Sequence, residues 1–440
     1  MKKSESKKAS RKKSKVAPAE AMETLKAVSP PEEMLSGEAE VDDSMPAAFE
    51  PNLERAFDLV MELMAIPGGS GKEKGVADFI AAKLFAAGAD PTCVEIDDAN
   101  QRTPLAGDTG NLILRLPGTQ RGPRRMLSAH MDTVPICIGS KPQRDGDFVR
   151  SADPNTGLGA DDRAGAATIL SAALEILERR LPHPPLTFCW FIQEEIGLYG
   201  ARHVQPSVLG KPQLAFNWDG SSSDKLTAGA TGGYRMEIHV EGIASHAGVA
   251  PERGVSAIVI AAMAIASIQR EGWHGSIARG SKRGTSNVGI LRGGEATNVV
   301  TDRVYVKAEA RSHDPKFRER IVAQIEKAFK KAAKELRNAT GKRGNVTFNG
   351  QLDYEAFRLR EDEPSVQVAE TAIRSIGGEP VRAIANGGVD ANWLYVHGIP
   401  AVTLGCGQVN PHMTSEALDI VAFQNACRIA LRLATGTETA

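Results

Sequence analysis

The amino-acid sequence predicts an α/β protein into which a smaller α+β domain is inserted, and three observations support this fold class. The first is the length of 440 residues, which exceeds one typical domain. The second is a series of uninterrupted apolar runs, typical of strands buried on both faces, that alternate with Ala-rich helical segments. The third is a change near Gly232 to alternating apolar and polar residues, typical of half-exposed antiparallel strands.

The first part of the α/β domain is predicted over residues 49–231. Helical patterns begin at residue 52 and at residue 72, and the first of them breaks at the turn around Pro67. Apolar runs of strand length follow within residues 111–118, 124–130, 186–192 and 213–220, with an Ala-rich helix over residues 164–180. Continuous apolar strands require helices on both faces of their sheet.

The inserted domain is predicted over residues 232–345. Alternating strands lie within residues 234–242, 287–291 and 304–312, and helices cover about 255–269 and 317–336. The α/β pattern then returns over residues 346–440. It contains a helix near 364–376, a strand within 400–405 and a last helix from about Ser415 to Leu433.

The first 48 residues are predicted to be a disordered tail, basic at first and then acidic. Eight of the first fifteen residues are basic and one is acidic, while the rest of the chain carries a net charge of about −8. An acidic body binds polyanions poorly, so a nucleic-acid partner is not expected. The alternative to a solvated tail is a contact between its basic block and an anionic surface.

Membrane and secretory classes are not expected from this composition. No stretch approaches the roughly eighteen uncharged apolar residues of a membrane span. The five cysteines are odd in number and form no C-x-x-C pair, which argues against a disulfide framework or a zinc knuckle. A reducing compartment suits them, so we expect a cytoplasmic protein.

Candidate catalytic residues gather where buried strands are predicted to end. His130 and Asp132 are one residue apart in SAHMDTVP, so in an extended strand they face the same way. Asp132 could then hold one ring nitrogen while the other binds a metal. Asp161 and Asp162 precede the Ala-rich helix, where the alternative role is helix capping.

Three further positions extend this pattern. Glu194 and Glu195 end an apolar run and point in different directions, which suits one metal ligand and one general base, although a solvated loop pair is the alternative. Asp219 follows another strand, where a turn is the alternative. His412 lies in a Gly/Pro-rich loop, where an ordinary surface histidine is the alternative.

As a set, these residues predict a metal centre at one edge of the sheet. Imidazole and carboxylate ligands without thiolates suit zinc, manganese or cobalt. Two histidines and three carboxylates exceed the needs of one catalytic metal. They suit two metals that share a bridging carboxylate.

The order H-x-D, G-A-D-D-R-A-G, E-E-I-G, D-G and a late His resembles the co-catalytic zinc exopeptidase family that includes peptidase T, carboxypeptidase G and aminoacylase. The resemblance covers about residues 52–435 and is strongest to peptidase-T-like members, through SHAGVAPERG, GGEATNVVTDRVYVKAEARS and NGGVDAN. It implies a mixed-sheet catalytic domain, an inserted ferredoxin-like dimerisation or lid domain, two zinc ions and a homodimer.

The resemblance also implies roles for the candidate residues. Asp161 would bridge the two ions, with His130 and Asp219 completing one site and Glu195 and His412 the other. Asp132 would orient His130, and Glu194 would move the proton from the attacking water to the leaving amine. The peptide bond between Asp161 and Asp162 is expected to be cis.

Substrate contacts follow from the same resemblance. His246 would act in the partner subunit's active site and stabilise the oxyanion, while Asn298 and Arg311 would bind the substrate backbone or carboxylate. Asn386 and Gly388 would shape the pocket. Peptidase T has H-P-G where this chain has Ala247 after His246, so a strict tripeptide specificity is not implied.

The predicted function is therefore a dinuclear zinc peptidase acting as an aminopeptidase on small peptides such as tripeptides. A carboxypeptidase or N-acyl amino acid deacylase of the same family is the alternative, since such enzymes share their metal ligands. A non-catalytic peptide-binding protein is a more remote alternative.

Overall fold

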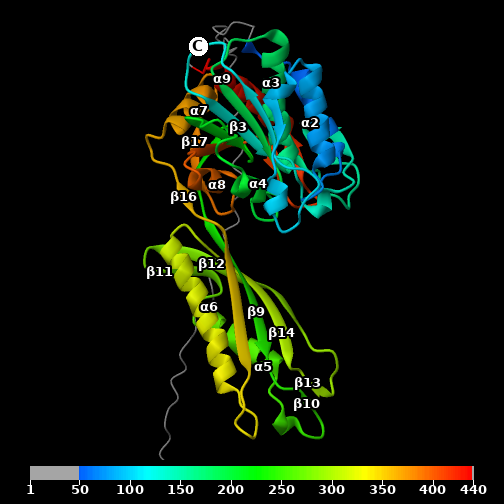
Figure 1. Ribbon diagram of the computed structural model, residues 1–440, viewed down its shortest axis with the longest axis vertical. Coiled ribbons are helices and arrows are strands. Elements are labelled where there is room, and N and C mark those ends of the chain that lie inside the picture. The colour runs from blue at the N-terminus through cyan, green and yellow to red at the C-terminus, as the bar shows by residue number, and fades with distance from the viewer. Residues whose placement is uncertain (1–48, 439–440) are drawn as a thin grey trace, which may run out of the picture. The chain divides into compact units, whose positions relative to one another are not determined.

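The computed structural model describes residues 49–438, so the predicted tail over residues 1–48 lies outside the described part of the chain. The described residues form two separate hydrophobic cores, and the two bodies that contain them are visible in Figure 1. The larger core combines residues from both ends of the described chain, and the buried residues of the smaller one all lie between Met236 and Ala333. A smaller domain is therefore inserted into a larger one, as the change of pattern near Gly232 predicts.

A nine-stranded mixed sheet forms the centre of the larger domain. Its strands follow the order β1-β2-β6-β3-β7-β18-β8-β16, and β17 pairs with β8. Neighbours β6, β3, β7 and β18 are parallel, whereas β2 is antiparallel to β6. Every residue of β3 and β6 is buried, so both faces of the sheet are covered. The strands are β1 (Val94–Ile96), β2 (Leu112–Leu116), β3 (Arg125–His130), β6 (Leu186–Phe191), β7 (Leu214–Trp218), β8 (Lys225–Ala230), β16 (Phe357–Arg358), β17 (Val381–Ala385) and β18 (Ala401–Leu404).

The helix α3 connects this sheet to the other helices, because it contacts α1, α9 and strand β3. Asn52 caps α1 by accepting the Arg55 N–H. In the described part of the chain, no helix combines the length and apolar character needed to cross a membrane. The helices are α1 (Leu53–Ala65), α2 (Lys74–Ala86), α3 (Ala160–Arg179), α4 (Tyr199–His203), α7 (Pro364–Arg374), α8 (Ala391–Val396) and α9 (Ile420–Thr435).

The start of the last helix corrects the sequence prediction. The helix begins at Ile420 and not near Ser415, because residues 417–419 form strand β20 and pair with β5. Asp419 then caps the helix by accepting the Ala422 N–H. The small antiparallel sheet contains β19 (Gln408–Val409), β20 (Ala417–Asp419), β5 (Phe148–Ser151) and β4 (Pro142–Asp145).

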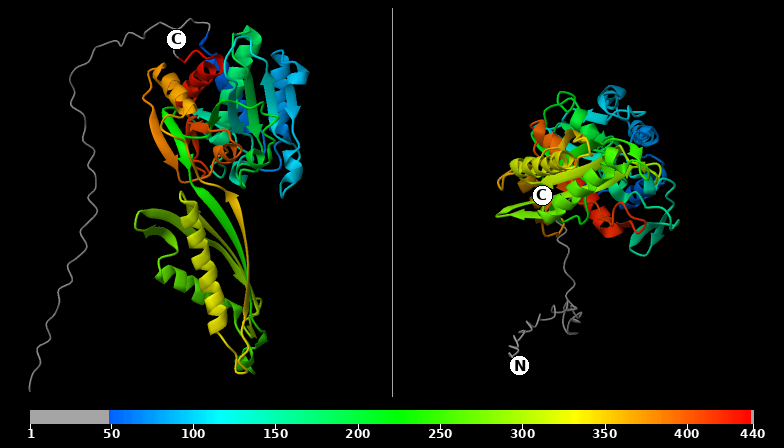
Figure 2. Two further views of the ribbon diagram at one scale, coloured as in Figure 1. Left: turned by 60° about the vertical axis from the view of Figure 1, so that its left-hand side comes forward. Right: turned by 90° about the horizontal axis from the view of Figure 1, so that it is seen from below.

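The inserted domain is a five-stranded antiparallel sheet in the order β11-β12-β14-β9-β15. Without the edge strand β11, the chain order β9-α5-β12-β14-α6-β15 and this strand order match a ferredoxin-like fold. Helix α6 lies along the sheet in Figure 1 and Figure 2. The elements are β9 (Gly232–Glu241), α5 (Ala257–Arg270), β11 (Gly275–Arg279), β12 (Lys282–Gly293), β14 (Arg303–Ser312), α6 (Pro315–Glu335) and β15 (Asn345–Tyr354), with the short pair β10 (Ser245–His246) and β13 (Val299–Val300).

The two faces of the inserted sheet differ in polarity. Along β14, buried residues alternate with partly exposed ones, as the alternating sequence predicts. The buried face packs in one core with α5 and α6. The other face carries charged side chains. The predicted domain boundaries at residues 232 and 345 stay predictions.

Removing a large side chain from the smaller core should destabilise the inserted domain. Phe329 is fully buried there, so Phe329→Ala is expected to cost about 3–5 kcal/mol of unfolding free energy through lost burial and a cavity. Urea unfolding followed by circular dichroism measures this loss. Phe85→Ala is the matched control, because Phe85 is 45% exposed and its loss should cost less than about 1 kcal/mol. Equal losses in the two variants would contradict the assignment of this core.

Candidate active site

Three parallel strands deliver most of the candidate residues to one edge of the large sheet. His130 is the last residue of β3, Glu194 and Glu195 follow β6, and Asp219 follows β7. Because β3 pairs in parallel with both β6 and β7, the carboxyl ends of these strands lie side by side. The sequence prediction that these strand ends meet is therefore in agreement with the structure.

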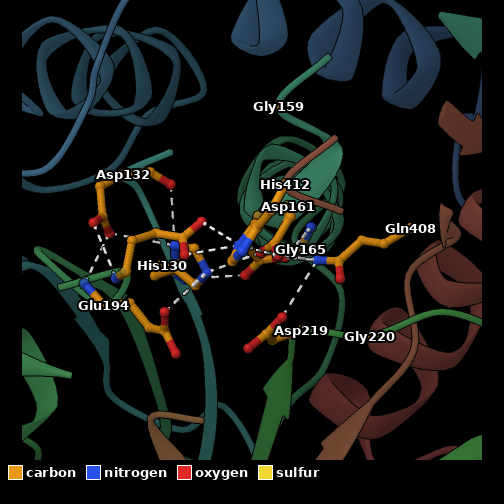
Figure 3. Close-up of polar contacts among 12 residues, drawn as sticks. His130, Asp132, Gly159, Asp161, Gly165, Glu194, Asp219, Gly220, Gln408 and His412 are labelled. Atoms are coloured by element: carbon orange, nitrogen blue, oxygen red, sulfur yellow. Dashed lines mark hydrogen bonds and ion pairs between the residues drawn. The ribbon is translucent and has the colours of Figure 1, made fainter. Parts of the chain in front are cut away.

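Asp161 lies at the centre of this group (Figure 3). Its Oδ1 is 3.2 Å from His130 Nε2, and its Oδ2 is 3.3 Å from His412 Nε2. His412 Nε2 is also 2.9 Å from Glu195 Oε2. Each oxygen of one carboxylate thus faces a different histidine, as a bridging ligand would require.

The side chains form two overlapping groups that could each hold a metal ion. One contains His130, Asp161 and Asp219, and the other contains Asp161, Glu195 and His412. Within each group the potential ligand atoms lie within 4.8 Å of one another. Asp161 belongs to both groups. The structure therefore brings together all five residues that the sequence nominates as ligands.

The two adjacent aspartates have different roles. Asp161 and Asp162 depart from helical backbone angles at the start of α3, and the peptide bond between them is cis, as the resemblance implies. Asp162 accepts the N–H groups of Gly165 and His130, at 3.1 Å each. The helix-capping alternative therefore applies to Asp162, whereas Asp161 faces the histidines.

Asp132 links His130 to the glutamate pair. Its Oδ1 lies 3.3 Å from His130 Nδ1, on the side of the ring opposite Asp161. The same carboxylate accepts the backbone N–H groups of Glu194 and Glu195, at 2.9 and 3.2 Å. It therefore fixes both the orientation of the imidazole and the position of the strand end that carries the two glutamates.

Glu194 lies beside the first group of candidate ligands. Its Oε2 is 3.9 Å from His130 Nε2, and the side chain is nearly buried. Burial, followed by the negative charges of Asp219, Glu195 and Asp390, raises the pKa of Glu194 well above its usual range. A carboxyl group in this environment favours accepting a proton, which is the property that a general base needs.

The cluster has a shortage of positive charge, which supports the fit of bound cations. Burial, followed by repulsion from Asp161, raises the pKa of Asp219 to about 6. Burial also raises the pKa of Glu195 to about 7. Hydrogen bonds with His130 and His412 outweigh burial and lower the pKa of Asp161, and bound cations would act on Asp219 and Glu195 in the same way. Oxygen and nitrogen donors in this number fit two divalent ions better than one.

Glu416 is a functional candidate that the sequence analysis missed. Its buried carboxylate accepts three backbone N–H groups, from Leu158 at 2.9 Å, Gly159 at 2.8 Å and Asp161 at 3.0 Å. Glu416 lies four residues after His412, so it ties the loop of one candidate ligand to the segment that carries the other. Glu416 lies in a polar loop sequence without helical or strand periodicity, so no sequence pattern distinguishes it from a surface glutamate.

The predicted substrate residues are not all near this cluster. His246 and Asn298 are exposed in the inserted domain, where the Asn298 carbonyl accepts the Ala247 N–H at 2.8 Å. Within residues 49–438, neither side chain forms a hydrogen bond or an ion pair with a candidate ligand. Asn386 Oδ1 lies 3.2 Å from His313 Nε2.

Tyr354 occupies the place that Gly388 leaves free. A Cβ atom added to Gly388 would lie 2.7 Å from Cζ of the Tyr354 ring. Arg311 pairs with Glu309 on its own strand. The five predicted substrate residues therefore remain predictions.

Two family models match the chain. Residues 229–337 match the peptidase dimerisation domain, and residues 111–243 match peptidase family M28. The uncharacterised protein YqjE of Bacillus subtilis is 32% identical over 370 residues, which cover 84% of this chain and 94% of YqjE.

Two solved structures of peptidases are similar over nearly their whole length. A tripeptidase of Staphylococcus aureus is 31% identical with a TM-score of 0.78, covering 89% of this chain and 100% of its own. The aminopeptidase PepT of Bacillus cereus is 32% identical with a TM-score of 0.74, covering 87% of this chain and 98% of its own. Both likenesses extend across the large sheet and the inserted domain.

Replacing Glu416 should weaken metal binding without removing a ligand. In Glu416→Gln an amide group replaces one oxygen that accepts backbone N–H groups, so the Asp161 segment loses part of its support. We expect zinc affinity to fall by about 10–100-fold, measured by competition with a coloured chelator. Glu62→Gln, at a surface carboxylate that is 50% exposed, is the control and should bind zinc normally. Unchanged affinity in Glu416→Gln would contradict this role.

Metal binding should release protons near neutral pH. Hydrogen bonds with Asp161 and then Glu195 raise the pKa of His412 to about 10, so its ring is protonated at pH 7 in the metal-free protein. A metal must displace that proton, so affinity should rise with pH up to about pH 10, by about tenfold per unit for each proton displaced. Zinc calorimetry at pH 7 in buffers of different ionisation enthalpy counts the protons. An affinity independent of pH would contradict this reading.

Proposed function

Because this chain belongs to the M20/M28 family of co-catalytic metallopeptidases, we propose that it is a dinuclear zinc exopeptidase that removes the N-terminal residue from short peptides. The observation that carries the proposal is the position of Asp161, which is shared by two groups of candidate ligands. His130 and Asp219 would hold one zinc ion with it, and Glu195 and His412 the other. Cobalt or manganese would suit the same donors.

The protein side chains would handle the proton in this reaction. When bound, the metal pair would polarise the scissile carbonyl and make the attacking water more acidic. Glu194 would accept the proton of that water and deliver it to the leaving amine. Its nearly buried carboxyl lies beside His130, which supports both steps. Asp132 would keep the His130 ring in the orientation that its ligand role requires.

His246 would supply a hydrogen-bond donor to the substrate oxyanion. Its Nδ1 accepts the N–H groups of Gly248 and Val249 at 3.2 Å each, so the neutral ring carries its proton on Nε2. That N–H is then available to a developing negative charge. Since His246 lies in the match to the peptidase dimerisation domain, we propose that it serves the partner subunit of a homodimer.

The domain arrangement fits the same proposal. Residues 49–231 and 346–440 would form the catalytic domain, and residues 232–345 the dimerisation and lid domain. Five free cysteines suit a reducing compartment, and we propose that the enzyme is cytoplasmic.

Aminopeptidase action is supported by the likeness to a tripeptidase and to the aminopeptidase PepT. Asn298 and Arg311 would hold the substrate backbone or its carboxylate, while Asn386 and Gly388 would shape the pocket. A carboxypeptidase or deacylase would use the same metal centre, so the products released from different substrate classes must distinguish these activities.

The test is a panel of dipeptides, tripeptides, N-blocked peptides and N-acyl amino acids, incubated with and without a chelator and identified by mass. Metal-dependent release of the N-terminal residue, lost when the amine is blocked, is the expected result. Cleavage of blocked substrates would assign a carboxypeptidase or deacylase instead. Complete inactivity with two zinc ions bound would favour a peptide-binding protein.

Glu194→Gln should abolish turnover while leaving two metal ions bound. The amide cannot accept a proton, and a general base contributes about 10²–10⁴-fold to the rate. Turnover of a tripeptide and metal content by mass spectrometry are measured on the same sample. Glu62→Gln serves again as the surface control and should retain full activity. Retained turnover in Glu194→Gln would exclude this residue as the base.

A further inference from the structure

The polar face of the inserted sheet carries a row of three residues from three neighbouring strands. Arg311 of β14 lies opposite Gly233 of β9, and Gly233 lies opposite Tyr354 of β15. The register of β15 shifts between Leu352 and Tyr354, which is a β-bulge. Because a bulge changes which side chain faces each side, it brings Tyr354 onto the face of Arg311.

Two glycines make room for the Tyr354 ring. A Cβ atom on Gly233 would lie 2.7 Å from Cζ of this ring, and so would one on Gly388. The ring is therefore held between β9 and the loop that contains Gly388. Tyr354 as a whole is only 8% exposed, but among the described residues its hydroxyl forms no hydrogen bond and keeps some contact with solvent. The hydroxyl can therefore bond a ligand that reaches this edge of the ring.

Arg311 is already occupied by a carboxylate. Its Nε lies 3.1 Å from Glu309 Oε1 and its Nη2 lies 3.0 Å from Glu309 Oε2, which is a bidentate pair. Arg235 is the second arginine on this face, and its Nε lies 3.1 Å from Asp353 Oδ2. Both guanidinium groups therefore have an acidic neighbour. A substrate carboxylate arriving here would meet a locally neutral surface.

This row borders the larger domain, because the Tyr354 ring packs against Gly388 in the loop before α8. The pKa of Tyr354 is raised first by burial and then by the negative charges of Glu309, Asp353 and Glu194, while Arg311 opposes them. The charges of the Arg311–Glu309 pair and of Glu194 therefore all act on the Tyr354 hydroxyl. The Arg311–Glu309 pair is partly exposed, with side-chain exposures of 34% and 39%, so it can exchange partners.

We propose that Glu309 occupies the Arg311 fork in place of the substrate's terminal carboxylate and thereby sets how strongly the enzyme selects for that carboxylate. This inference rests on the proposed peptidase function. On binding, the substrate carboxylate takes the position of Glu309, so one charge-assisted pair replaces another and little free energy is gained. Tyr354 borders the exchange site and offers its hydroxyl to the incoming group.

The consequence concerns substrate class. An enzyme that requires a free carboxylate beside the scissile bond needs an arginine whose charge is available. Here Glu309 competes for that charge, so peptides with a free or an amidated C terminus should bind with similar affinity. This tolerance suits an aminopeptidase that acts on peptides of several lengths.

The test compares a tripeptide with its C-terminal amide, using the zinc-loaded full-length protein. Glu309→Gln removes the competing charge and should lower KM for the free acid about fivefold, because a half-exposed pair is worth roughly 1 kcal/mol. KM for the amide should stay within about twofold of the wild type. In the double variant Glu309→Gln with Arg311→Gln, the gain for the acid should disappear.

Glu237→Gln is the matched control. Glu237 Oε1 lies 3.0 Å from Lys307 Nζ, across the pair of strands β9 and β14. Its substitution should change the KM of neither peptide. Calorimetric binding of the same two peptides to Glu194→Gln protein, with and without Glu309→Gln, separates this inference from turnover. If the wild type cleaves neither peptide, the proposed function fails, but the binding difference still decides the role of Glu309. Equal effects on acid and amide, a gain that survives Arg311→Gln, or no binding of either peptide would overturn the inference.

Discussion

The burial of neighbouring carboxylates is the constraint on which the rest of this structure depends. Burial raises the pKa values of Glu194, Glu195 and Asp219 at one sheet edge, whereas hydrogen bonds with His130 and His412 outweigh burial and lower the pKa of Asp161. Other groups hold the cluster together, because Asp132 and Glu416 accept the backbone N–H groups of the segments that carry these residues. Such an arrangement is stable when cations occupy its centre.

Much of this site could be predicted from the sequence because its residues lie at the ends of strands. The buried runs ending at His130, Glu194 and Asp219 predict parallel neighbours, and parallel neighbours present their carboxyl ends at one edge. His412 joined the set less directly, because it lies in a Gly/Pro-rich loop some residues after the strand within 400–405, where a surface histidine was the alternative. Glu416 was missed for a different reason. Its function depends on backbone N–H groups of residues 158–161, which are more than 250 residues away in the chain.

In the inserted domain, too, the sequence predicts some features and misses others. Its alternation of apolar and polar residues predicts which face of β14 is buried, and it also places Glu309 on the side of Arg311. The position of Tyr354 could not be predicted, because it depends on a bulge in β15 and on two glycines from other segments. The predicted start of the last helix was wrong, because residues 417–419 pair with strand β5, which is distant in the sequence.

The most direct test of the account is X-ray diffraction at the zinc absorption edge, recorded from crystals of metal-loaded protein. The account predicts two anomalous peaks about 3.5–4 Å apart, one among His130, Asp161 and Asp219 and the other among Asp161, Glu195 and His412. A single peak, or peaks that do not share Asp161, would contradict it.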